Sequence, residues 1–274
     1  YFNMTFIPLM MPLMVAMGVG PLLAWKRGDL PGALQRLKVV AGISFAAFFA
    51  AWLLSDSHSA LAALGLAIGL WLVGSCFAYF ADRIKLFSLP FKESMRRARG
   101  LPRATWGMTL AHAGVGIFVI GITVSGGWQE QNLAIMHSGD SVKVGDYSFT
   151  LAGVRDNVPG HGFSATRATF DVYRGGNLVT VMHPEVRHFQ VPKMDTTEAA
   201  IHTMFLADLY AVVGKAQGGG YATRIYWKPL VTWIWGGALI MALGGGLSLS
   251  DRRHRVGAPV RKTAGAGKTA PSAA

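Results

Sequence analysis

The sequence predicts an α-helical integral membrane protein of about five spans, with a small antiparallel β-rich domain inserted before the last span. Three observations predict this class. Hydrophobic residues make up 51% of the 274 residues. Charged residues make up 15%, whereas a soluble domain carries about 25%. The net charge is +12, and most of the basic residues lie in three short segments between or after the apolar runs.

Five apolar runs approach or reach the length of roughly 20 residues that a membrane helix needs. The second run is the shortest, and a polar region separates the fourth run from the fifth. The five predicted spans are residues 6–24, 39–54, 60–80, 105–124 and 229–250. The expected domains are four spans with basic loops (1–124), a β-rich domain (125–228), the last span (229–250) and a tail (251–274) whose composition favours disorder from Gly257.

The first run favours an internal membrane helix over a signal peptide. It begins at Tyr1, lacks a basic region and a small-residue cleavage site, and is interrupted by Pro8, Pro12 and Gly20. We therefore expect the chain to be a fragment of a larger protein or to have a misassigned start.

The distribution of charge predicts an orientation. Residues 25–38, 81–104 and 251–274 together hold 17 basic and four acidic residues, a balance of +13, whereas the rest of the chain has a balance of −1. Cytoplasmic loops of membrane proteins carry an excess of Lys and Arg. This predicts cytoplasmic basic segments, a periplasmic region 125–228 and a bacterial inner-membrane location. The basic excess requires no nucleic acid to explain it.

The polar region reads as β structure. Apolar residues alternate in 146–154, and the same style recurs in 164–173 and 178–183, with Arg174-Gly175-Gly176-Asn177 between them as a hairpin turn. Further strands are expected at 186–191 and 221–227. Residues 196–213 stay open, with TEAAI favouring a helix. The pattern predicts a small antiparallel barrel or sandwich.

The side chains that could bind a metal show no converging set. Cys76 is the only cysteine, which excludes an internal disulfide and favours a packing role. Zinc needs three or four converging ligands, and no spacing fixes such a set, so no zinc site is predicted. The histidines predicted to be periplasmic are expected to be solvated or hydrogen-bonded; they are His137, His161, His183, His188 and His202, with His58 in a short outer loop.

His112 lies inside the predicted fourth span. An ionisable residue there indicates function by default, whereas a neutral imidazole bonded to a neighbouring helix would add about 1 kcal/mol of packing. Both readings stay open from the residue alone. Gly116, one turn on, would leave clearance for a flat cofactor such as haem, which histidine ligates. Packing alone would also use the small residues on this helix, which are Gly107, Ala111, Gly114 and Gly121.

The motifs resemble the CcmF family, the haem lyase subunit of the cytochrome c-type biogenesis system. The resemblance covers nearly all of residues 1–256 and corresponds to the C-terminal portion of the family. It is carried by WGMTLAHAGVGIFVIG around His112, YFNMTFIPLMMPLMVAMGVGPLLAWKR, HPEVRHF, TEAAI, DLYAVVG and RIYWKPLVTWIWGGALIMALGGGLSLSDRRHR.

The resemblance implies a membrane haem b held by two histidines. His112 matches the second axial ligand, and the first would lie N-terminal of Tyr1. The family's WWD motif and its flanking histidines, which receive haem, are absent here; Trp233-Ile234-Trp235 lies in the last span and is not that motif. The implied role is to assist reduction of haem and its covalent attachment to apocytochrome c. This chain is not expected to be active alone.

The resemblance also implies a set of partners. They are the N-terminal part of the same protein, the haem carrier CcmE, maturation proteins of the CcmH type, apocytochrome c, membrane lipid and quinol. Two alternatives stay open: a haem b electron-transfer subunit without a ligase role, and a non-catalytic membrane anchor for a periplasmic interaction domain.

Overall fold

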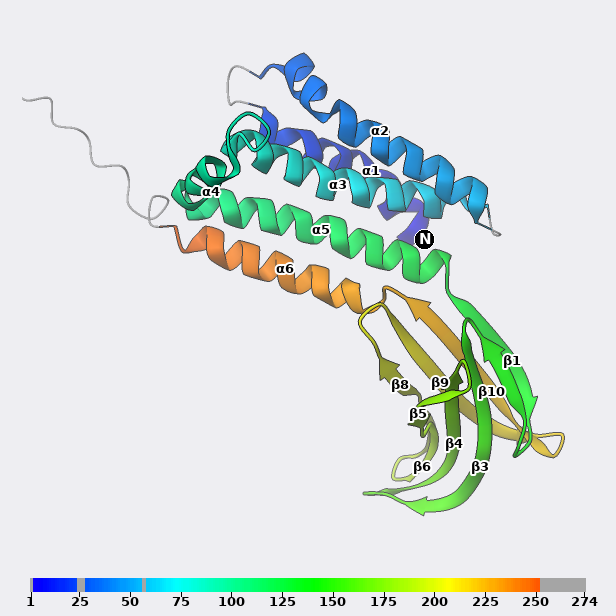
Figure 1. Cartoon of the computed structure of the whole chain (residues 1–274). Helices are drawn as coiled ribbons and strands as arrows, with labels where there is room; N and C mark the ends of the chain where they lie inside the picture. The colour runs from blue at the N-terminus through cyan, green and yellow to red at the C-terminus, as the bar shows by residue number, and fades with distance from the viewer. Residues whose placement is uncertain (1, 24–27, 56–57, 252–274) are drawn as a thin grey trace, which may run out of the picture.

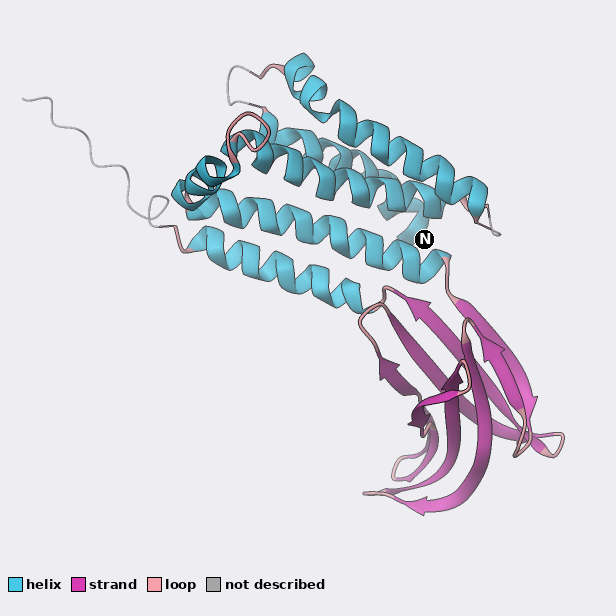
Figure 2. Ribbon diagram, viewed as in Figure 1, coloured by secondary structure: helices cyan, strands magenta, loops and turns pink. Residues whose placement is uncertain are grey.

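The chain forms a bundle of long helices that continues at one end into a β sandwich (Figure 1). In this computed structural model residues 2–23, 28–55 and 58–251 are described. Among these residues five helices are long and apolar enough to cross a membrane, and all described strands lie in the sandwich (Figure 2). The fold class expected from the sequence is therefore confirmed. The tail expected to be disordered lies outside the described residues, except for its first residue.

Helices α2, α3 and α5, with 25 residues each, are longer than the apolar runs that predict them. The second span, expected at 39–54, begins at Leu30 because the Asp29 side chain accepts a hydrogen bond from Gly32 N (2.9 Å) and caps the helix. Its first turns include Arg36 and Lys38, which are exposed. The helices are α1 Phe2–Val19 with a 3₁₀ turn Gly20–Leu22, α2 Leu30–Leu54, α3 Ala60–Ile84, α4 Phe91–Gly100, α5 Arg103–Gly127 and α6 Thr232–Leu249.

The short helix α4 was not expected from the sequence. It is formed by part of the basic segment that connects α3 to α5 (Figure 1). Ser94 Oγ donates to the Lys85 carbonyl (3.2 Å), and Trp106 Nε1 donates to the Ala98 carbonyl (3.1 Å). These two bonds tie α4 to the end of α3 and the start of α5.

The glycine strip on α5 packs against α6 of the same chain. A Cβ added at Gly107 would lie 2.5 Å from Gly244 O, and one at Gly114 would lie 2.8 Å from Gly237 O. Small residues at such an interface let two helix backbones approach closely in a membrane. The packing role expected for the strip is confirmed, and its partner is the next helix along the fold rather than a cofactor.

The end of the α5–α6 pair is closed by a buried acid. Asp251 follows α6 and is 7% exposed, and its Oδ2 accepts a hydrogen bond from Ala104 N (3.0 Å) in the first turn of α5. A carboxylate satisfies the free N–H groups of a helix start and interacts favourably with its dipole. Ala104 and Asp251 are 147 residues apart in the sequence, so no local pattern predicts this cap.

The β domain is a sandwich of two antiparallel sheets. One sheet has the order β1-β10-β9-β8, and the other has the order β2-β3-β4-β6-β7, with β5 pairing β4. Phe149, Phe170, Leu209 and Ile225 are fully buried between them. The strands are β1 Glu130–Met136, β2 Ser141–Val144, β3 Tyr147–Pro159, β4 Phe163–Arg174, β5 Asn177–Met182, β6 Glu185–Gln190, β7 Lys193–Glu198, β8 Ala200–Thr203, β9 Ala207–Gln217 and β10 Gly220–Pro229.

The expected hairpin is confirmed, and one helical preference is wrong. Arg174 pairs with Asn177, and the glycines between them have φ of +56° and +84°, the positive values that a two-residue turn requires. Residues 196–213, where TEAAI favoured a helix, instead form the end of β7, all of β8 and most of β9. The pairing of β7 with β6 and of β8 with β9 outweighs the local helical preference.

Candidate functional site

His112 lies near the middle of α5, and its ring is partly buried. Ring atom Nδ1 lies 2.9 Å from the carbonyl oxygen of Met108, one turn earlier. A carbonyl oxygen can only accept, so the neutral ring carries its proton on Nδ1 and keeps a lone pair on Nε2. No described residue bonds Nε2. A backbone carbonyl on one ring nitrogen is the arrangement that orients metal-binding histidines.

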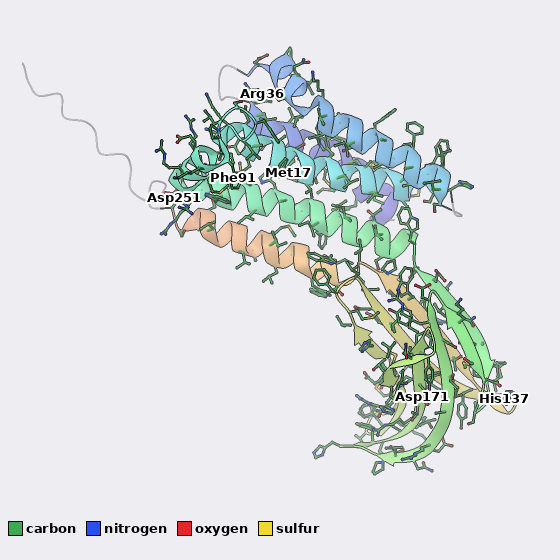
Figure 3. The ribbon with its side chains drawn as sticks, viewed as in Figure 1. Met17, Arg36, Phe91, His137, Asp171 and Asp251 are labelled. Atoms are coloured by element: carbon green, nitrogen blue, oxygen red, sulfur yellow. The ribbon has the colours of Figure 1, made fainter. Side chains whose placement is uncertain are left out.

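The His112 ring faces a small cavity between α1, α3 and α5. Its volume is about 10 Å³, which is room for one water molecule. Ser75 on α3 also lines the cavity, is 2% exposed, and its Oγ has no hydrogen-bond partner among the described residues. Met17 of α1 is labelled in Figure 3. The lining residues are Met17, Gly18, Pro21, Ser75, Cys76, Tyr79, Met108, Thr109 and His112.

Gly116 does not leave the open clearance expected from the sequence. Helix α3 fills that space: a Cβ at Gly116 would lie 2.9 Å from Gly69 O and 2.7 Å from a methyl group of Val73. Gly116 is therefore a contact between α5 and α3. The sequence showed that this face of α5 is bare but could not show which neighbour covers it.

The residues present fit one axial position of a haem iron. The candidate donor is a partly buried imidazole whose Nε2 has no partner among the described residues, and Ser75 Oγ beside the same cavity is buried without a hydrogen-bond partner among them. The cavity itself has room for a water molecule and not for a porphyrin. The helix that closes it, α1, has only 6% of its apolar window buried, the smallest share of the five candidate spans among the described residues.

Sequence reasoning missed most of the residues around His112. The Met108 carbonyl could have been found, because it lies four residues before His112 on the same helix face. Ser75 and Met17 could not, because they come from two other helices whose packing the sequence does not specify. Cys76, interpreted as a packing residue, also lines the cavity.

The histidines of the β domain do not converge. His183 Nδ1 lies 3.3 Å from Thr169 Oγ1, and His188 Nδ1 lies 2.8 Å from an Asp195 carboxylate oxygen. Within residues 2–23, 28–55 and 58–251, no group of three or more His, Cys, Asp or Glu side chains is placed to hold a metal ion.

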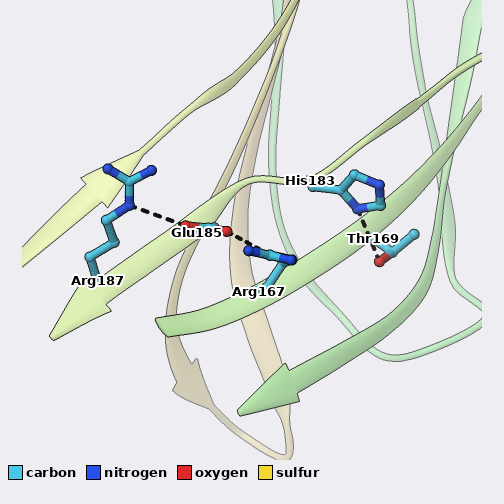
Figure 4. Close-up of polar contacts among 5 residues, drawn as sticks. All are labelled: Arg167, Thr169, His183, Glu185 and Arg187. Carbon is cyan, nitrogen blue, oxygen red and sulfur yellow. Dashed lines mark hydrogen bonds and ion pairs between the residues drawn. The ribbon is translucent and has the colours of Figure 1, made fainter. Parts of the chain in front are cut away.

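A buried glutamate organises the HPEVRHF segment (Figure 4). Glu185 is 7% exposed and accepts hydrogen bonds from Arg167 Nε (2.5 Å) and Arg187 Nε (3.1 Å). Burial raises the pKa of the Glu185 carboxyl, but the bonds from Arg187 and Arg167 outweigh it and hold that pKa below its ordinary value of 4.5. The HPEVRHF segment, one of those that carry the resemblance, thus has a structural role where β6 pairs with β4.

We expect Glu185 to make the stability of the sandwich pH-dependent. A lowered native pKa stabilises the fold fully above the unfolded carboxyl pKa of 4.5 and loses that contribution as pH falls through the lower native pKa. Glu185→Gln should cost about 1–3 kcal/mol at neutral pH and flatten the acid dependence. Chemical unfolding of the purified chain in detergent at neutral and acid pH measures both.

The matched control for Glu185 is an exposed ion pair. Asp146 and Arg174 lie 3.0 Å apart with side chains 74% and 58% exposed, and such pairs contribute about 0–1 kcal/mol. Asp146→Asn should therefore leave stability almost unchanged. Equal effects of the two substitutions would contradict the role given to Glu185.

Comparisons with known proteins agree with this architecture. Residues 127–229 match the family model described as the CcmF C-terminal beta-sandwich. Cytochrome c-type biogenesis protein CycK of Bradyrhizobium diazoefficiens is 43% identical, covering 94% of this chain and 39% of that protein. Cytochrome c-type biogenesis protein CcmF of Escherichia coli strain K12 is 36% identical, covering 96% of this chain and 39% of that protein.

A solved structure shares the fold. The structure titled Cytochrome c Heme Lyase CcmF superposes with a TM-score of 0.69 at 23% identity, covering 91% of this chain and 40% of that one. The chain spans about two fifths of the length of these relatives. By the matching sandwich, the identity to curated relatives and the shared arrangement of helices, the chain belongs to the CcmF family of cytochrome c-type biogenesis proteins and corresponds to its C-terminal portion.

Proposed function

We propose that this chain is part of a haem lyase component that assists the reduction of haem and its covalent attachment to apocytochrome c. The carrying observation is His112, whose Nδ1 is held by the Met108 carbonyl (2.9 Å) so that Nε2 is available inside the helix bundle. The relation to cytochrome c-type biogenesis proteins supports the same role.

In this proposal His112 would be one of the residues that hold a haem b. The bound group would supply one-electron chemistry, which keeps delivered haem in the reduced state. The protein's own contribution is to fix the imidazole: the Met108 carbonyl selects the tautomer and limits rotation of the ring. His112 acts as a ligand and not as a general acid or base.

The proposed partners are those that the resemblance to the CcmF family implies. The N-terminal part of the protein would supply the second axial histidine and the surface that receives haem. The β sandwich would provide a docking surface for CcmE, for maturation proteins of the CcmH type or for apocytochrome c. Quinol would be the source of electrons.

We further propose that the sandwich is periplasmic and that the basic segments are cytoplasmic in a bacterial inner membrane. Figure 3 places Arg36, Phe91 and Asp251 at the end of the bundle away from the sandwich, and excess Lys and Arg favours the cytoplasmic side. Alkaline phosphatase inserted after Gly176 should therefore be active, whereas the same enzyme inserted after Gly100 should be inactive. The reverse pattern would overturn this orientation.

Covalent haem staining of a c-type cytochrome reporter tests the proposed function. Cells lacking their own CcmF-type protein would express this chain with the other maturation proteins, with or without the N-terminal part of a relative. We expect attachment only when both parts are present, because a low-spin haem b needs two strong axial ligands. Attachment by this chain alone would contradict the division of roles.

The same cells separate the two alternatives. A quinol-reducible haem without any effect on attachment would identify an electron-transfer subunit. A purified assembly without a Soret band would identify a membrane anchor.

A further inference from the structure

A large apolar groove lies between α2 and α3, outside the His112 cavity. Its volume is about 740 Å³. Its wall contains Val39, Ile43, Leu70 and Phe77, of which Val39, Ile43 and Phe77 are 56–64% exposed. Both helices are long and apolar enough to span a membrane, and the exposed apolar side chains of this wall match the chemistry of acyl chains.

Charged residues line one end of the groove. Arg36, Asp82 and Lys85 line this end, together with Ser88. Arg36 NH1 lies 3.0 Å from Asp82 Oδ2, so these two charges largely neutralise each other. The Lys85 side chain is exposed and has no ion-pair or hydrogen-bond partner among the described residues. The mouth of the groove therefore carries one unneutralised cation.

Helix α4 extends this cationic mouth. It is bonded to the groove through Ser94 Oγ and the Lys85 carbonyl (3.2 Å). Phe87, shortly before α4, and Phe91, its first residue, are 83% and 69% exposed. Exposed aromatic rings next to Lys and Arg are typical of a helix that lies in a membrane interface. The basic residues of α4 are Lys92, Arg96, Arg97 and Arg99.

We propose that this groove binds an anionic phospholipid, with its acyl chains along α2 and α3 and its phosphate at Lys85. Basic pockets at the ends of membrane helices bind anionic headgroups, with about 1 kcal/mol per Lys or Arg. The free Lys85 charge favours an anion over a neutral quinone ring or an apolar helix, neither of which would neutralise it. The α4 cations do not line the groove, so they attract anionic lipids to the membrane surface in general and do not hold the bound headgroup.

Lipid retention by the purified chain tests this site. The full chain would be reconstituted into vesicles containing equimolar phosphatidylglycerol and phosphatidylcholine, re-extracted into detergent and examined by native mass spectrometry. We expect about one retained phosphatidylglycerol per chain. Lys85→Gln should weaken retention about fivefold, the equivalent of ~1 kcal/mol. Ala78→Trp, which fills the groove, should abolish it.

Two matched variants separate a site from general attraction. Lys92→Gln removes the same charge from α4, which does not line the groove, and Ala46→Trp adds the same ring to an exposed position of α2 outside it. Both should retain phosphatidylglycerol as the unsubstituted chain does. Equal retention of the two lipids, equal weakening by Lys85→Gln and Lys92→Gln, or a quinone as the retained molecule would each overturn the proposal.

Discussion

His112→Ala should remove most of the low-spin haem b absorption from the complete assembly while the protein still inserts into the membrane. The physical reason is the loss of one of two strong axial ligands, since the methyl group of alanine offers no donor. Reduced-minus-oxidised spectra of the purified assembly measure the effect, and the amount of protein in the membrane fraction verifies insertion.

A histidine of the β domain provides the control. His183→Ala removes an imidazole whose Nδ1 lies 3.3 Å from Thr169 Oγ1. His183 lies between β5 and β6 in the sandwich and not in the helix bundle. The haem spectrum of this variant should match that of the unsubstituted protein. Undiminished bis-histidine absorption in the His112→Ala variant would contradict the ligand role. His112 would then be a packing residue hydrogen-bonded to the Met108 carbonyl.

Gly244→Leu should separate α5 from α6, whereas Gly245→Leu, at the adjacent position, should not. A Cβ at Gly244 would lie 2.5 Å from Ala111 N and 2.7 Å from Gly107 O, and both atoms belong to a backbone that cannot move aside. A Cβ at Gly245 meets no atom within 4 Å. Overpacking at Gly244 should cost about 3 kcal/mol or more, and Gly245→Leu should stay within about 0.5 kcal/mol.

Thermal unfolding of the two variants in detergent distinguishes these outcomes, because the substitutions add the same side chain to the same helix. The α5–α6 pair also carries the sandwich, since β1 follows α5 and β10 precedes α6. Gly244→Leu should therefore increase proteolysis at the ends of the sandwich as well. Similar melting temperatures for the two variants would show that the glycine strip is not a tight interface.

The sequence predicted those features that depend on composition and local pattern. Five apolar runs and the distribution of Lys and Arg indicated the spans, and the alternating residues indicated most of the sandwich. Helix α2 begins earlier than the apolar run predicts, at Leu30, because Arg36 and Lys38 lie in an exposed helix end that tolerates charged residues. The sequence pattern does not predict β1 or β2, because β2 has only four residues and β1 begins with polar residues.

The surroundings of His112 depended on long-range packing and could not be predicted. The sequence marked the histidine and the small residues beside it, but only the fold shows that α3 covers Gly116 and that Ser75 faces the same cavity as the ring. The same limit applies to Asp251, which caps a helix that begins at Arg103. Each of these contacts joins segments whose relative positions no local pattern specifies.

The most direct test of the central claim is the haem spectrum of the His112→Gly variant of the complete assembly, recorded before and after addition of imidazole. Glycine removes the ligand and leaves space beside Met108 and Thr109, so a free imidazole can take the vacant axial position. The account predicts loss of the low-spin haem b signal and its return with imidazole. A low-spin spectrum that is the same with and without imidazole would contradict the assignment of His112 as the axial ligand.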